Sequence, residues 1–267
     1  MRGTIDDLLE LVRRLRAPDG CPWDREQTLQ TVRAYLLEEA HEAAHAIDEN
    51  DPQALRAELG DLLFQVAFVG VLAEEQGEFR LADSIRTVHR KMVARHPHVF
   101  ATSLEESNSD LDAAEVSRRW EARKASEKRA GESLLDGIAP TLPALTAAYR
   151  LGQKAAGVGF DWPDIGPVLD KVREELTEVE AEIAADPSKT QRRRLEEEVG
   201  DLLFAIVNLA RHLALDPEAS LARTNAKFRR RFAFVEAELR RRDRDPTDSS
   251  LEEMDAIWNA AKADEAR

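Results

Sequence analysis

Apolar residues recur at steps of three and four positions through most of the chain. Residues 5–15 and 228–239 show this spacing clearly, and it is the spacing that gives a helix one apolar face. The sequence shows no convincing run of alternating Val, Ile, Thr and aromatic residues, and no Asn-Gly or Asp-Gly turn between two such runs. The pattern therefore predicts an all-α protein.

Proline marks most of the expected helix ends, often beside an Asp or Ser that can cap the next helix. Such breaks occur at residues 17–20, 50–52, 96–98, 186–188, 216–217 and 245–246. Glycine and proline are also concentrated near the middle of the chain, in residues 131–143. We expect residues 131–144 to be a linker between two domains.

An internal repeat supports this division. The heptapeptide ELGDLLF of residues 58–64 returns as EVGDLLF at residues 198–204, and EEAHE at residues 38–42 returns as EELTE at residues 174–178. Two basic and aromatic elements also recur downstream: Lys91, Arg95, Trp120 and Lys124 in the first half, and Lys227, Arg231, Trp258 and Lys262 in the second. Four elements in the same order predict two tandem copies of one helical module, residues 1–130 and 145–267.

Composition narrows the function classes. With 267 residues, 43% of them hydrophobic, the chain is long enough for two modest cores. Its net charge of −14 argues against a nucleic-acid partner, because such a surface must be basic. The longest apolar stretch, residues 62–73, is shorter than the roughly 20 residues that span a bilayer, so no membrane role is expected. A single cysteine, Cys21, fits a cytoplasmic location.

Acidic residues in each repeat are spaced to share a helix face. Glu39 with Glu42, and Glu58 with Asp61, lie three residues apart, so each pair points in one direction. The apolar run after Asp61 indicates a largely buried helix, with its acidic first turn at the edge of the core. Buried like charges require a counter-charge, and four carboxylates from two facing helices suit a hard divalent cation, with Mg²⁺ the default.

The candidate metal ligands of the two modules are Glu39, Glu42, Glu58 and Asp61 in the first, and Glu175, Glu178, Glu198 and Asp201 in the second. The basic pair Lys227 and Arg231 would put two cations on one helix face, where they can hold phosphate oxygens. A solvated helix surface is the alternative for either charge pattern.

These residues, taken together, resemble a known family. EExxE followed by ExxD marks the all-α nucleoside triphosphate pyrophosphatases, and the chain resembles the MazG nucleoside triphosphate pyrophosphohydrolases over essentially its whole length. Further matching segments are GCPWD at residues 20–24, RHPHVF at 95–100, VGFDW at 158–162 and NLARH at 208–212.

The resemblance implies a homodimer of helical bundles that uses Mg²⁺ to hydrolyse NTPs, with dNTPs or non-canonical nucleotides as further candidate substrates, to NMP and pyrophosphate. It implies that Lys227, Arg231, Trp258 and Lys262 surround the nucleotide, and that a water attacks the α-phosphorus. Both modules have complete carboxylate sets. We expect the second to be the main site because it is richer in basic residues, with catalysis assigned to Glu175, Glu178, Glu198, Asp201, Lys227 and Arg231.

Two other functions remain open at this point. The chain contains HExxH at residues 41–45, the signature of zinc proteases, but the second module has Thr177 and Ala181 in place of His41 and His45. The repeat thus keeps the acids and discards the histidines. A non-catalytic nucleotide-binding or scaffold protein is the other alternative, and nucleotide hydrolysis with and without a chelator discriminates among the three.

Overall fold

The computed structural model describes residues 3–100, 116, 119–120, 123, 133–184 and 189–265. Within these residues it contains helices and no strand, which confirms the prediction of an all-α protein. The contacts divide the chain into two compact units, residues 1–120 and 121–267. Each described helix is too short or too polar to cross a bilayer.

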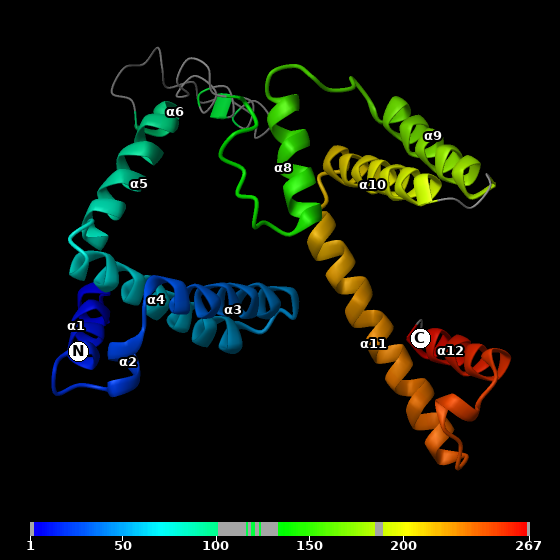
Figure 1. The fold of residues 1–267 in the computed structure, drawn as a ribbon, viewed down its shortest axis with the longest axis horizontal. Helices are drawn as coiled ribbons and strands as arrows, with labels where there is room; N and C mark the ends of the chain where they lie inside the picture. Colours follow the sequence, from blue (N-terminus) through cyan, green and yellow to red (C-terminus); the bar gives the residue numbers. More distant parts are fainter. Residues whose placement is uncertain are drawn as a thin grey trace. The chain divides into compact units, whose positions relative to one another are not determined.

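Six helices of the first unit are described from end to end (Figure 1). They are α1 (Ile5–Arg16), α2 (Pro22–Glu26), α3 (Leu29–Asp48), α4 (Pro52–Glu75), α5 (Leu81–Arg95) and α6 (Pro97–Phe100). Helix starts follow the expected signals. The side chain of Thr28 accepts a hydrogen bond from the Thr31 amide at the start of α3, and Asp51 caps α4 directly before Pro52.

The second unit repeats this order. Its described elements are α8 (Ala144–Ala156), α9 (Ile165–Ala184), α10 (Lys189–His212), α11 (Pro217–Arg241), the short 3₁₀ turn η1 (Pro246–Asp248) and α12 (Leu251–Glu265). The expected linker, residues 131–144, falls within the second unit. Residues 131 and 132 lie outside the described residues, and α8 already begins at Ala144.

Matching helices pack in the same way in both units. In the first, α3 and α1 both pack against α4, and in the second, α9 and α8 both pack against α10. Figure 1 shows α3 lying along α4 and α9 lying along α10. One detail of the expectation was wrong, because α4 begins at Pro52 and Glu58 and Asp61 therefore lie about two turns into the helix, not in its first turn.

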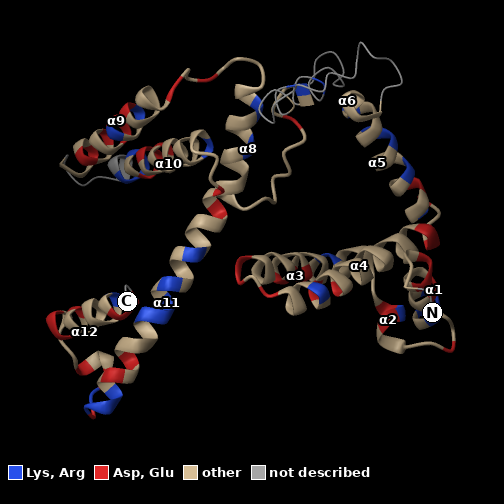
Figure 2. Ribbon diagram, turned by 180° about the vertical axis from the view of Figure 1, so that it is seen from behind, with Lys and Arg blue, Asp and Glu red and all other residues tan. Residues whose placement is uncertain are grey.

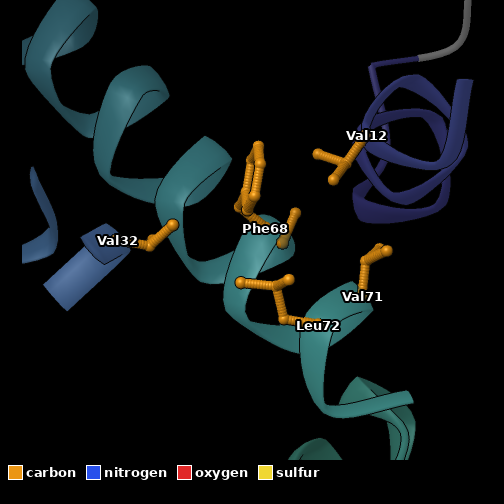
Figure 3. Packing of buried hydrophobic residues seen from close by; sticks show 6 residues of the cluster. Val12, Val32, Phe68, Val71 and Leu72 are labelled. Carbon is orange, nitrogen blue, oxygen red and sulfur yellow. The ribbon is translucent and has the colours of Figure 1, made fainter. Parts of the chain in front are cut away.

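The core of the first unit lies where α1, α3 and α4 meet. Figure 3 shows Val12 of α1 facing Phe68 and Val71 of α4, with Val32 of α3 beside the same helix. All four side chains are at least 98% buried. Burial of α4 is confined to its second half, because Leu59 and Leu63, nearer the acidic residues, are about half exposed.

In the second unit, a salt bridge fastens the loop of residues 157–164 onto α10. Asp161 accepts hydrogen bonds from Arg211 Nη1 at 2.8 Å and from Nη2 at 2.5 Å, and its Oδ1 lies 2.9 Å from His212 Nε2. Burial acts to raise the pKa of Asp161, but the hydrogen bonds from Arg211 and His212 outweigh it and lower that pKa. Two segments singled out in the sequence, VGFDW and NLARH, therefore meet here.

Phe68 is expected to anchor the first unit. Replacing it with alanine in the sealed core removes a large buried ring and leaves a cavity, which destabilises a domain by about 3–5 kcal/mol. Urea unfolding of Phe68→Ala followed by circular dichroism measures this loss. Leu63→Ala, on the same helix but 49% exposed, is the control and should lose far less; equal losses would contradict the assignment of Phe68 to the core.

Stability of the second unit should depend on pH through Asp161. Because its pKa is lower in the folded state than the ordinary 3.8, the pair stabilises the fold above that value and the contribution disappears as pH falls through the folded pKa. Asp161→Asn should cost about 1–3 kcal/mol at pH 7 and less at a pH well below 3.8, as measured by urea unfolding. Asp170→Asn breaks an exposed pair with Arg173 and should change little at either pH.

Candidate functional site

Three carboxylates converge between α9 and α10. Glu175 of α9 and Glu198 and Asp201 of α10 offer oxygen atoms that all lie within 4.8 Å of one another. Glu175 is only 5% exposed, and its Oε2 is buried without a hydrogen-bond partner among the described residues. Burying a carboxylate oxygen without a partner costs free energy, unless a cation or a hydrogen-bond donor binds to that oxygen.

The first unit has the matching arrangement between α3 and α4. Oxygen atoms of Glu39, Glu58 and Asp61 also lie within 4.8 Å of one another. Burial raises the pKa of Glu39, and the charges of Asp61 and Glu42 raise it further. In contrast to Glu175, Glu39 is only half-buried.

The fourth predicted carboxylate of each set, Glu42 or Glu178, stands outside these close groups and is exposed. Both are nevertheless near enough to act electrostatically. Partial loss of hydration raises the pKa of Glu178 even though the residue is exposed, and the neighbouring Glu175 and Glu198 add to that increase. A carboxyl group with a raised pKa is a better proton acceptor near neutral pH than an ordinary glutamate.

Lys171 is a site residue that the sequence reasoning missed. Its Nζ lies 2.7 Å from Glu175 Oε1 and 2.8 Å from Glu174 Oε1, and both hydrogen bonds raise the pKa of Lys171. The available signal was its position one helical turn before Glu175. The repeat gave no help, because Tyr35 occupies the matching position one turn before Glu39.

Two of the three carboxylates of the second unit, Glu175 and Asp201, line a cavity of about 240 Å³. Lys171, Glu175 and Asp201 line one part of it, and Trp162, from the loop before α9, lines another. The site thus combines a negative cluster, one cation and an aromatic wall. This is an arrangement that can hold a cation together with an anionic ligand.

The predicted basic and aromatic residues lie on a different helix pair, α11 and α12, which pack against each other. Figure 2 shows Lys and Arg recurring along α11. The guanidinium of Arg231 lies 5.8 Å from the ring centre of Trp258 and pairs with Glu265 at 2.6 Å, while Lys227 and Lys262 are exposed. The structure places this group and the carboxylates on separate helix pairs.

The first unit reproduces the arginine–tryptophan contact, with Arg95 lying 5.1 Å from the centre of the Trp120 ring. Lys124, the expected counterpart of Lys262, lies outside the described residues. The basic and aromatic element is therefore repeated in the structure as well as in the sequence, and in both units the arginine covers the tryptophan ring.

The two histidines of the HExxH segment, His41 and His45, are exposed on α3. Among the described residues, neither belongs to a group of side chains close enough to hold a metal ion. The donor atoms that do converge are carboxylate oxygens, which are the ligands of Mg²⁺ and similar hard cations and not those preferred by a protease zinc.

Comparisons with known proteins agree with this arrangement. A family model described as the MazG nucleotide pyrophosphohydrolase domain matches residues 27–100 and 167–234. These ranges contain both acidic clusters.

Three relatives illustrate the similarity. A nucleoside triphosphate pyrophosphohydrolase of Escherichia coli K12 is 47% identical, over 98% of each chain. A nucleoside triphosphate pyrophosphohydrolase/pyrophosphatase MazG of Thermotoga maritima is 40% identical, over 97% of this chain and 95% of the relative. The uncharacterized protein YabN of Bacillus subtilis is 43% identical over 96% of this chain, which spans 51% of YabN.

Both the family model and the full-length similarities point to one family. The repeated acidic helix pairs, which the sequence alone already revealed, coincide with the two matched segments. The chain belongs to the MazG family of nucleotide pyrophosphohydrolases and carries the family's domain twice.

Proposed function

We propose that this protein is a Mg²⁺-dependent nucleoside triphosphate pyrophosphohydrolase that releases NMP and pyrophosphate. The observation that carries the proposal is the buried, unpartnered Oε2 of Glu175, which lies beside Glu198 and Asp201 at a cavity of about 240 Å³ that Glu175 and Asp201 line. Family membership and the names of the E. coli and T. maritima relatives support the nucleotide substrate. NTPs, dNTPs and non-canonical nucleotides are all candidate substrates.

Glu175, Glu198 and Asp201 would hold the magnesium ion, with Glu178 as the adjoining fourth carboxylate. When bound, magnesium neutralises the charge on phosphate oxygens and acts as a Lewis acid. Three carboxylates in close proximity repel one another, so a dication is also the natural counter-charge for this cluster.

The chain's own residues have separable tasks. Lys171 would donate a hydrogen bond to a phosphate oxygen, because the residue lines the cavity and its Nζ lies beside Glu175. Glu178, the exposed carboxylate beside the metal ligands, would accept the proton of the attacking water. Trp162 forms an apolar side of the cavity.

We assign the main activity to the second module. Its Glu175 is buried, whereas Glu39 of the first is half-buried, and a lysine, not a tyrosine, precedes it by one turn. Glu39, Glu42, Glu58 and Asp61 remain a candidate second metal site. Lys227, Arg231, Trp258 and Lys262 are proposed to contact the nucleotide.

A homodimer is the proposed assembly. Leu176 and Leu203, on α9 and α10, are about half exposed, and a second copy would remove such apolar side chains from water. We place the protein in the cytoplasm, where a single cysteine stays reduced.

Replacing one carboxylate in each module tests the assignment. Glu175→Gln should lower kcat/KM for NTPs by about 10²-fold or more, because a metal ligand is lost, while Glu39→Gln should retain most activity. AMP and pyrophosphate released from ATP are measured by chromatography. Glu180→Gln, an exposed change on α9, is the control. Loss of turnover with Glu39→Gln alone would place the active site in the first module.

Metal removal should abolish turnover. With excess chelator the wild-type protein is expected to release no AMP, and added Mg²⁺ should restore the rate, because the carboxylate cluster then regains its counter-charge. Product identification decides the bond that is cleaved. ADP and phosphate in place of AMP and pyrophosphate would contradict attack at the α-phosphorus, and stimulation by zinc with cleavage of peptides would favour a protease.

A further inference from the structure

A second, larger cavity adjoins the acidic one in the second unit. It has a volume of about 550 Å³ and lies between α8, α10 and the loop of residues 157–164. Trp162, Phe204 and Asn208 line both cavities, so the two are neighbours along α10. Most of the remaining wall is apolar, with contributions from Leu135, Leu151 and Ala155.

In the first unit, buried apolar side chains of α4 occupy the matching place. A shift of 140 residues aligns ELGDLLF with EVGDLLF and continues along both helices without interruption. Under this shift the buried Phe68, Val71 and Leu72 correspond to Asn208, Arg211 and His212. Three apolar core residues of α4 are thus replaced by polar residues in α10.

The helix that faces this region, α1 in the first unit and α8 in the second, also has smaller side chains in the second unit. Val12 of α1 packs against Phe68 and Val71, whereas the same shift places Gly152 of α8 there. A Cβ on Gly152 would lie only 3.2 Å from Arg211 Nε. The shift also pairs Leu15 with Ala155, which lines the cavity. Both changes on α8 remove side-chain volume.

Arg211 keeps this space open. Its guanidinium is paired with Asp161 and donates through Nε to Asn208 Oδ1 at 2.9 Å, and its side chain is only 12% exposed. A paired, buried charge cannot move onto an apolar wall without losing these bonds. Because Nε must donate, the Oδ1 of Asn208 faces Arg211 and the amide NH₂ is left to donate elsewhere.

We infer that this cavity is the subsite for the planar base of the nucleotide, with Arg211 as the positioning residue that holds it open. The inference rests on the proposed function. A nucleotide has an aromatic ring at one end and phosphates at the other, and the unit offers an apolar cavity joined to a carboxylate site. Its volume is typical of ligand pockets, and the Asn208 amide is available to donate to an acceptor on the base.

The first unit serves as the guide for the test. Ala155→Leu introduces the residue that the first module has at the matching position, and should fill the cavity without touching the carboxylates. The KM for ATP is expected to rise at least about 10-fold, while the inhibition constant of inorganic tripolyphosphate, which has no base, stays unchanged. Ala237→Leu, an exposed change on α11, is the matched control and should leave both constants at the wild-type values.

Two outcomes would overturn the inference. An unchanged KM for ATP would show that the base lies elsewhere, and a parallel rise of the tripolyphosphate constant would show a general disturbance of the unit. If Ala155→Leu does not fold, as judged by circular dichroism, Gly152→Ala is the second variant. Its methyl group crowds Arg211, and the same split between the two constants is expected.

Direct binding separates this inference from the proposed function. Adenosine carries the base and ribose without phosphates, and its binding to wild type and to Ala155→Leu can be compared by calorimetry. Binding to wild type that is lost in the variant supports the subsite even if no NTP is hydrolysed. Equal binding to both proteins, or none to wild type, contradicts it. Absence of NTP turnover alongside normal adenosine binding would count against the proposed function only.

Discussion

The candidate site of the second unit depends on one buried carboxylate, that of Glu175. Glu175 is buried on α9, and its charge is tolerated because Lys171 pairs with one oxygen while the other remains available to a cation. The α9–α10 pair must pack closely to achieve this burial, and the same packing brings Glu198 and Asp201 to Glu175. The fold thus gathers three carboxylates between α9 and α10, and a bound cation would offset their mutual repulsion and so stabilise this helix pair.

The two units show how one helical frame supports different interiors. Both keep a buried valine near the start of the helix that carries EExxE, Val32 on α3 and Val168 on α9, and in both this helix packs against the helix that carries ExxD. They differ where α1 or α8 crosses the central helix. There the first unit packs apolar side chains around Phe68, and the second has a cavity bounded by a salt-bridged arginine. A sealed core gives stability, and an open one gives room for a ligand.

The helices could be predicted from the spacing of apolar residues and from the proline and capping residues at their ends. Capping residues such as Thr28 and Asp51 act through local hydrogen bonds, so the sequence alone reveals them. Three of the four carboxylates predicted in each unit lie together, since EExxE and ExxD place carboxylates on helix faces. The pairing of Lys171 with Glu175 and the cavity beside Gly152 could not be predicted. They depend on contacts that form only in three dimensions, and on which face each helix turns toward its neighbours. No local pattern distinguishes Gly152 from any other glycine in a helix.

The alignment of the repeats also affects how the chain can change over time. Duplicated sequences are open to gene conversion, in which one copy overwrites the other. Copying α4 onto α10 would place Phe at position 208 and Val at position 211, filling the cavity and leaving Asp161 without its arginine. The reverse event would bury an unpaired arginine against Val12. Copying either module onto the other would therefore damage the recipient module. The two modules are expected to stay different at these core positions while their acidic motifs stay alike.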